Sequence, residues 1–382
     1  MVGTKNRCLM SRKSPSTAQK STLKHRHPLK LKSLPRWLSI LLVVIYVVTG
    51  IFQPIVLDLI SRMGGAEKQA FLFPIPNSMG MALLMAIPTR KSHYSRRASL
   101  YKFPKEIIVM TLIDVSATTL TLFGQLMIGS GLYIIVYSSL TIWSAIGSLL
   151  LLKRHFTWPM WMGVVVVTIG LMISGVGAFT TFGLSTLIGM AVTLVGTILH
   201  SGVYWVSEYF CLHKEYPIHS TFLAGYMGIF GVAIFLSYVT GYTIPRWEAL
   251  FVQPMEAGGG SYWKILSTYL LLILIDWAHL YAQFTAVVAV GSVIVGINKA
   301  ISSIGVFVLS HFLFCEVDSS ECIDLFKILS LCFVISGVII YTTAYHYYKK
   351  KQNRLQGSQK SPQEDTLIDQ LPSSETPPLS LE

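Results

Sequence analysis

Long uninterrupted runs of apolar residues constrain this chain more than any other feature. Charged residues make up only 13% of its 382 residues, whereas an ordinary soluble domain carries about 25%. Ten runs are each long enough to cross a hydrocarbon core of roughly 30 Å as a helix that rises 1.5 Å per residue. The sequence therefore predicts an all-α membrane protein with ten transmembrane helices. We expect them at about 38–60, 71–89, 106–128, 131–152, 160–178, 185–211, 219–240, 265–287, 291–314 and 325–347.

The basic residues predict the orientation of these helices. If the N-terminus is cytoplasmic, 24 of the 30 Lys and Arg fall in the loops and tails on the cytoplasmic side. Cytoplasmic loops of membrane proteins carry an excess of Lys and Arg, so both termini are expected in the cytoplasm. The formal net charge of +12 is then a consequence of orientation, and no nucleic acid is expected as a partner.

The two ends of the chain differ in composition from the apolar runs. Residues 1–37 contain ten Lys or Arg and no Asp or Glu. This favours a disordered basic tail at the anionic cytoplasmic leaflet, with an organelle transit peptide as the alternative. Residues 348–382 are polar and rich in Pro and Ser, which predicts a disordered cytoplasmic tail. Two membrane units, 38–178 and 185–347, lie between the tails.

The two membrane units resemble each other at an offset of 162 residues. Clusters of matching residues keep one phase without gaps: 111–120 with 273–282, Gly129–Ser130 with Gly291–Ser292, and 172–175 with 334–337. A preserved phase favours an internal repeat of five helices. Because five is an odd number, the two repeats are expected to have opposite orientations in the membrane, an arrangement typical of transporters.

The segment SSLTIWSAIGSLLLLKRHFTWPMWMGVVVVTIGLMISG at 138–175 contains a helix of small residues, a basic hairpin, and a helix with Trp161, Gly163 and Gly170. In these motifs and in its two five-helix repeats the chain resembles the drug/metabolite transporter superfamily (EamA-like). INKAISSIGVFVLSHFLFCE in the second half is similar to the matching helix of the nucleotide-sugar/triose-phosphate transporter branch of the solute carriers. The resemblance covers about 38–347 and departs from the family in the acidic, Cys-bearing loop after Phe314. It implies solute transport and no catalytic residues.

Charged and polar residues inside the apolar runs indicate a polar cavity. Asp276, His279 and Gln283 are spaced so that they share one face of a helix. An ionised carboxylate in mid-membrane costs roughly 2.5–3.5 kcal/mol on insertion scales, and such groups usually face an interior cavity. Asp114 has the same phase as Asp276 in the first repeat. Lys299 is the Lys that lies clearly inside a run.

Three further residues complete the predicted substrate site. Tyr137 aligns with Lys299 in the repeat, and His200 and Tyr204 are one helical turn apart. For Asp276 and Lys299 a purely structural ion pair is the alternative. For the histidines, a packed structural role is equally compatible with the sequence.

Cys315 and Cys322 bracket the sequence CEVDSSEC between the last two runs. The predicted topology puts this loop outside the cytoplasm or in a lumen, where disulfides persist. Six intervening residues permit a bridge. A disulfide and a pair of free thiols are the two interpretations.

These observations favour a secondary transporter or exchanger that moves a small polar or anionic metabolite by alternating access, with a nucleotide sugar or phosphorylated metabolite preferred. The alternatives are a proton-coupled carrier of organic cations or amino acids, and a membrane scaffold without transport. An enzyme is not expected, because zincin and nucleophile-elbow motifs are missing, and neither is a cofactor or a metal. The expected partners are a small-molecule substrate and the lipid bilayer, with a homodimer left open. A eukaryotic endomembrane (Golgi, ER or vacuole) is favoured over the plasma membrane or a plastid.

Overall fold

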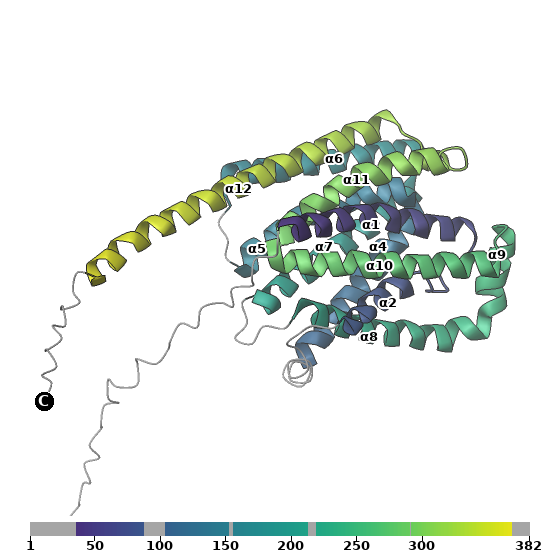
Figure 1. The fold of residues 1–382 in the computed structure, drawn as a ribbon. Helices are drawn as coiled ribbons and strands as arrows, with labels where there is room; N and C mark the ends of the chain where they lie inside the picture. Colours follow the sequence, from purple (N-terminus) through teal and green to yellow (C-terminus); the bar gives the residue numbers. More distant parts are fainter. Residues whose placement is uncertain (1–35, 88–103, 153–155, 213–218, 291, 369–382) are drawn as a thin grey trace, which may run out of the picture.

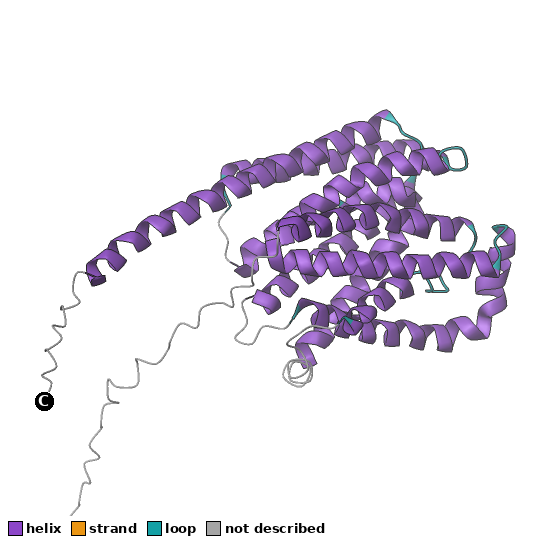
Figure 2. Cartoon of the chain, in the orientation of Figure 1, coloured by secondary structure: helices purple, strands orange, loops and turns teal. Residues whose placement is uncertain are grey.

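The computed structural model describes residues 36–87, 104–152, 156–212, 219–290 and 292–368, in which helix is the only regular secondary structure (Figure 2). The predicted tail 1–37 and the basic loop after residue 87 lie almost entirely outside these residues. The longer helices are α1 (Arg36–Arg62), α2 (Ile75–Leu83), α4 (Pro104–Tyr137), α5 (Leu140–Leu152), α6 (Trp158–Phe182), α7 (Leu184–Leu212), α8 (Ser220–Tyr238), α10 (Tyr262–Val290), α11 (Ser292–Phe314) and α12 (Leu325–Ile368). Shorter helical segments lie at Leu84–Ala86, Val239–Thr243, Ile244–Arg246, Glu248–Val252, α9 (Gln253–Ala257) and Ser319–Glu321.

Six helices are long and apolar enough to cross a membrane, which fits an integral multi-pass membrane protein. They lie at Ile40–Arg62, Pro104–Tyr137, Leu184–Cys211, Ser220–Arg246, Tyr262–Val288 and Leu325–Gln352. Four further apolar helical stretches are shorter: Ile75–Ala86, Leu140–Leu151, Trp158–Gly170 and Ile301–Phe314. Six of the ten predicted spans therefore meet this criterion among the described residues, and the other four correspond to the shorter apolar stretches.

The helix boundaries differ from the predicted ones at three places. The run at 71–89 becomes helical only at Ile75, because Pro76 suits the first turn of a helix, where its missing N–H is not needed. The predicted boundary near residue 130 is a kink inside α4, where Gly129 has a φ of 75° that favours glycine. The tail predicted to be disordered from residue 348 is instead helical as far as Ile368. Lys, Gln, Arg and Leu just after residue 348 are good helix formers and extend a helix that is already nucleated, whereas Gly357 and Pro362 farther along disfavour helix. Residues 369–382 lie outside the described part of the chain.

Small residues allow the helices to pack closely. A Cβ atom added to Gly163 of α6 would lie 2.7 Å from the carbonyl oxygen of Gly337 in α12, so these helices meet backbone to backbone. Gly124 of α4 likewise faces Thr193 of α7 with no room for a side chain. Such contacts are typical of helices packed in a membrane.

Figure 1 shows that α1 begins and α12 leaves the bundle at the same end. The loop between α11 and α12 lies at the opposite end, near the last turn of α1. The polar residues that the sequence singled out lie between these two ends.

Candidate functional site

A small polar cavity lies among α1, α2, α4, α10 and α11. The volume within which the centre of a water molecule could lie is about 20 Å³. Because roughly 10–15 Å³ on this measure is enough for one water, the cavity has room for water. Apolar side chains form much of its wall. Its polar lining consists of Gln53, Asn77, Gln125, Tyr133, Asp276 and Lys299.

Asp276 is buried in α10 and contacts α1. Gln53 Nε2 of α1 donates a hydrogen bond of 2.7 Å to Asp276 Oδ1. On the other side, a Cβ atom added to Gly80 of α2 would lie 2.8 Å from Asp276 Cβ. The glycine lets α2 approach, so that the carboxylate is held between two helices.

Lys299 is buried in α11, with 3% of its surface exposed. Its Nζ lies 5.1 Å from the centre of the Tyr137 ring, in cation–π range. Among the described residues, no ion pair within 4.0 Å joins Lys299 to Asp276. The two charges that the sequence singled out thus share one cavity but are held apart, which differs from a directly bonded pair.

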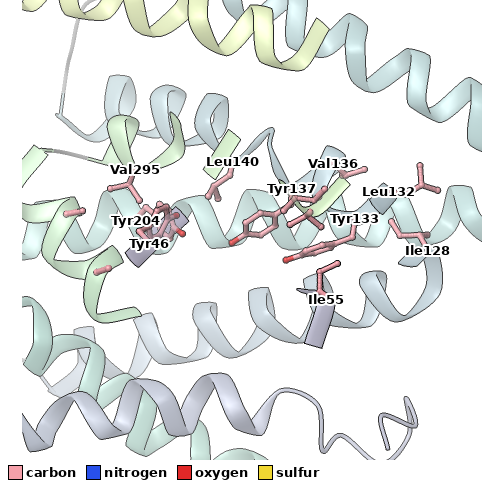
Figure 3. Close-up of a cluster of buried hydrophobic side chains, with 14 of the residues drawn as sticks. Tyr46, Ile55, Ile128, Leu132, Tyr133, Val136, Tyr137, Leu140, Tyr204 and Val295 are labelled. Carbon is pink, nitrogen blue, oxygen red and sulfur yellow. The ribbon is translucent and has the colours of Figure 1, made fainter. Parts of the chain in front are cut away.

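A group of aromatic residues adjoins the cavity at Lys299. Tyr137 OH lies 3.1 Å from His200 Nδ1, and the His200 ring is edge-on to Tyr204. Figure 3 shows Tyr133 and Tyr137 side by side, with their hydroxyl oxygens on the side that faces Tyr46 and Tyr204. Tyr137, His200 and Tyr204 therefore lie together, beside the cavity wall rather than in it.

The remaining predicted site residues are buried outside the cavity lining. His279 stacks on Tyr46, with ring centres 4.5 Å apart, and its Nδ1 lies 3.0 Å from Thr49 Oγ1. Gln283 and Asp114 are 4% exposed each, and neither lines this cavity. Asp276, His279 and Gln283 share one face of α10, but only Asp276 lines the cavity. Neighbouring helices cover the rest of that face.

Four cavity residues were not predicted as site residues. Gln53 and Gln125 are polar residues inside apolar runs, the pattern that indicates a cavity, but the predicted substrate site did not include them. Gln125 Nε2 donates to the Pro54 carbonyl oxygen at 2.8 Å, which links α4 to α1. Asn77 follows a proline-rich turn, and Tyr133 looks like any core aromatic, so sequence alone gave no reason to choose them.

Cys315 and Cys322 form a disulfide, with Cα atoms 4.5 Å apart. His311 has a ring nitrogen within 4.8 Å of both sulfurs. A disulfide has no thiolate to offer a metal, so this grouping is not a metal centre.

No model of a known protein family matches the chain. No curated protein matches it either. One solved structure, described only as "Crystal structure of protein", is similar at 14% sequence identity over 81% of this chain and 98% of its own, with a TM-score of 0.48. That likeness is too weak to assign a family or a function. The class that can be stated is an all-α chain with the character of an integral multi-pass membrane protein.

Proposed function

We propose that the protein is a secondary transporter that moves a small polar or charged metabolite across a membrane by alternating access. The observation that carries the proposal is the cavity in which a buried ammonium, a buried carboxylate and three amides meet. Polar groups inside apolar helices are costly, and they commonly mark solute or ion pathways. A cavity of this size holds water but no metabolite, so in the proposed cycle this is an occluded state and helices must separate to admit a substrate.

The packing of the helices supports a further part of the proposal, namely ten transmembrane helices in two inverted repeats. If α1, α2, α4, α5 and α6 correspond to α7, α8, α10, α11 and α12, most contacts occur in matching pairs. α7 packs on α4 and α5, and α1 packs correspondingly on α10 and α11. α4 packs on α8 as α10 packs on α2, while α2–α8 and α6–α12 pair equivalent helices. A pseudo-two-fold axis produces this pattern, and substrate sites of such transporters lie at the repeat interface.

For the substrate we favour a nucleotide sugar or another phosphorylated metabolite. Lys299 would attract the anionic group, and the tyrosines beside it offer faces and hydroxyls to a ring or a sugar. The separation of Asp276 from Lys299 favours a second candidate, an amino acid or similar zwitterion. Lys299 could bind the carboxylate of such a substrate while Asp276 binds its ammonium group. In either case we propose that the protein acts in an endomembrane with both termini in the cytoplasm.

A stability screen of the purified protein tests the proposal. Nucleotide sugars, sugar phosphates and amino acids are added in turn, and the thermal midpoint is measured. A ligand at 100 times its Kd adds about 2.7 kcal/mol of stability. The stabilising solute is then tested for uptake into proteoliposomes. Lys299→Met should lose both effects, whereas Lys264→Met, on the exposed start of α10, should keep them. A solute that binds but is never taken up would contradict transport and favour a scaffold.

A further inference from the structure

Three buried and three partly exposed charged residues lie at the end of the bundle at which α11 and α12 are joined. We call this group the disulfide-end cluster, because the Cys315–Cys322 bridge lies in the same loop. Its residues come from the end of α1, the α11–α12 loop and the start of α12. They are Asp58, Arg62, Asp318, Glu321, Asp324 and Lys327.

Glu321 occupies a site that fits its carboxylate closely. It is 1% exposed, and its Oε2 accepts a 2.9 Å hydrogen bond from the backbone N–H of Gly131. That N–H belongs to the first turn after the Gly129 kink, where free backbone N–H groups favour an acceptor. A Cβ atom on Gly131 would lie 2.7 Å from Oε2 and 3.0 Å from Ser310 Oγ. Any residue other than glycine at position 131 would therefore collide with the carboxylate.

The other oxygen of Glu321 is buried without a hydrogen-bond partner among the described residues. A buried acceptor without a partner is costly. A proton on this oxygen would remove a buried negative charge. Burial therefore favours a neutral carboxylic acid, whereas the Gly131 N–H, Ser310 and Lys327 favour the carboxylate, so the two forms compete at this site.

The neighbouring groups leave an excess of negative charge. Asp58 Oδ2 accepts from Ser130 Oγ at 3.1 Å and lies 3.7 Å from the Arg62 guanidinium. Arg62 also reaches Asp318 at 3.4 Å, which fastens α1 to the loop.

At the start of α12, Lys327 Nζ donates to the Cys322 carbonyl oxygen at 2.7 Å and lies 3.9 Å from Asp324. With every group ionised, the cluster would contain four carboxylates and two cations. Like charges brought together in a buried site favour uptake of a proton.

We propose that Glu321 is a proton-binding residue that controls the opening of this end of the bundle. With Glu321 protonated, the α11–α12 loop stays packed on α1 and α4. Loss of the proton leaves a buried carboxylate near Asp58, and the loop separates from the kink. The role of this gate in a transport cycle rests on the proposed function, but the gate itself does not.

The titration of Glu321 gives the direction of the effect. Burial, followed by the nearby charge of Asp58, raises the pKa of Glu321 from 4.5 to about 7. In an opened, hydrated loop the pKa would return to its ordinary value. The closed form thus binds the proton more tightly, so its extra stability is complete below pH 4.5 and is lost as the pH rises through about 7. Between those values the ratio of closed to open molecules should change up to about tenfold per pH unit.

A distance measurement on the full-length protein tests the gate without any substrate. Spin labels are placed at two exposed positions on either side of it, Gln69 before α2 and Val317 in the disulfide loop. The background carries Cys8→Ser, Cys211→Ala and Cys332→Ser and keeps the disulfide. Electron–electron distance distributions are recorded in nanodiscs from pH 5.5 to 8.5. We expect a growing population with a longer distance as the pH rises.

Three variants distinguish Glu321 from its surroundings. Glu321→Gln, a permanent mimic of the neutral acid, should keep the short distance at every pH. Glu316→Gln, an exposed acid in the same loop, should behave as the parent protein. Glu321→Asp keeps a carboxylate that is too short to reach Gly131, so the pH midpoint of its transition should shift. If Glu321→Gln fails to fold, an unchanged midpoint in Glu321→Asp would overturn the proposal.

Two other results would also overturn it: an unchanged distance distribution in the parent protein across this pH range, or the parental pH response in Glu321→Gln. Uptake into proteoliposomes, measured on the same preparations, separates this inference from the proposed function. A pH-dependent distance without uptake of any solute would contradict the transporter and support the gate. Uptake with a pH-independent distance would contradict the gate alone.

Discussion

The charges of Asp276 and Lys299 give the sharpest test of the candidate site. The perturbation is Asp276→Asn, Lys299→Met and the double variant. Asparagine keeps an oxygen for the Gln53 amide that now donates to Asp276 at 2.7 Å. Methionine keeps most of the apolar stem of lysine, so that packing is changed little.

The structure sets the size of the effect on stability. The two charges are more than 4.0 Å apart, so their attraction at an effective dielectric constant of roughly 20 is below about 4 kcal/mol. Removing one member of a close buried pair costs on the order of 3–5 kcal/mol. At the longer separation here we expect each single variant to lose about 1–3 kcal/mol. The double variant should regain most of this loss, with a coupling energy of about 1–3 kcal/mol.

The assay combines thermal unfolding with uptake of labelled nucleotide sugars, sugar phosphates and amino acids into proteoliposomes. Both single variants should lose uptake, and the double variant should fold but remain inactive, because it has lost the groups that bind the solute. Lys264→Met on α10 is the matched control and should keep both properties. Substantial uptake by the double variant at parental abundance would refute the reasoning, since the charges would then only stabilise each other.

Three further predictions follow from the packing, the disulfide and the predicted topology. Gly163→Val should destabilise the α6–α12 contact by more than about 2 kcal/mol in thermal unfolding, because a Cβ atom alone would lie 2.7 Å from the Gly337 oxygen. Gly241→Ala, where the space is open, should change stability by less than about 0.5 kcal/mol, and equal effects would contradict this account. Cys315 and Cys322 should react with a maleimide in the denatured protein only after reduction, and mass spectrometry of unreduced protein with both thiols labelled would exclude the bridge. Tags at the two chain ends should be reachable by antibody once the plasma membrane alone is opened, and a tag protected in a lumen would contradict the predicted orientation.

The sequence alone predicted the helical, membrane-protein character of the chain and two of its buried charged residues. Apolar runs too long for a soluble core require helices, because a backbone in lipid must satisfy its own hydrogen bonds. The cost of Asp276 and Lys299 within such runs marked them as interior residues, and both line the cavity. The spacing of Cys315 and Cys322 allowed the disulfide that the structure contains. Each of these inferences depends on local composition and spacing.

The partners of those residues were decided by the tertiary structure. Helical periodicity puts Asp276, His279 and Gln283 on one face, but different parts of that face contact different neighbouring residues and helices. Asp276 consequently meets Gln53, and His279 meets Tyr46 and Thr49.

Glu321 shows the same limit most clearly. In the sequence it is one acid in a short polar loop, where exposure to water is the ordinary outcome. Only the kink at Gly129, which lies 192 positions earlier in the chain, creates the free backbone N–H groups that its carboxylate reaches. Contacts between residues so distant in sequence depend on how the helices cross, and no local pattern of residues specifies that.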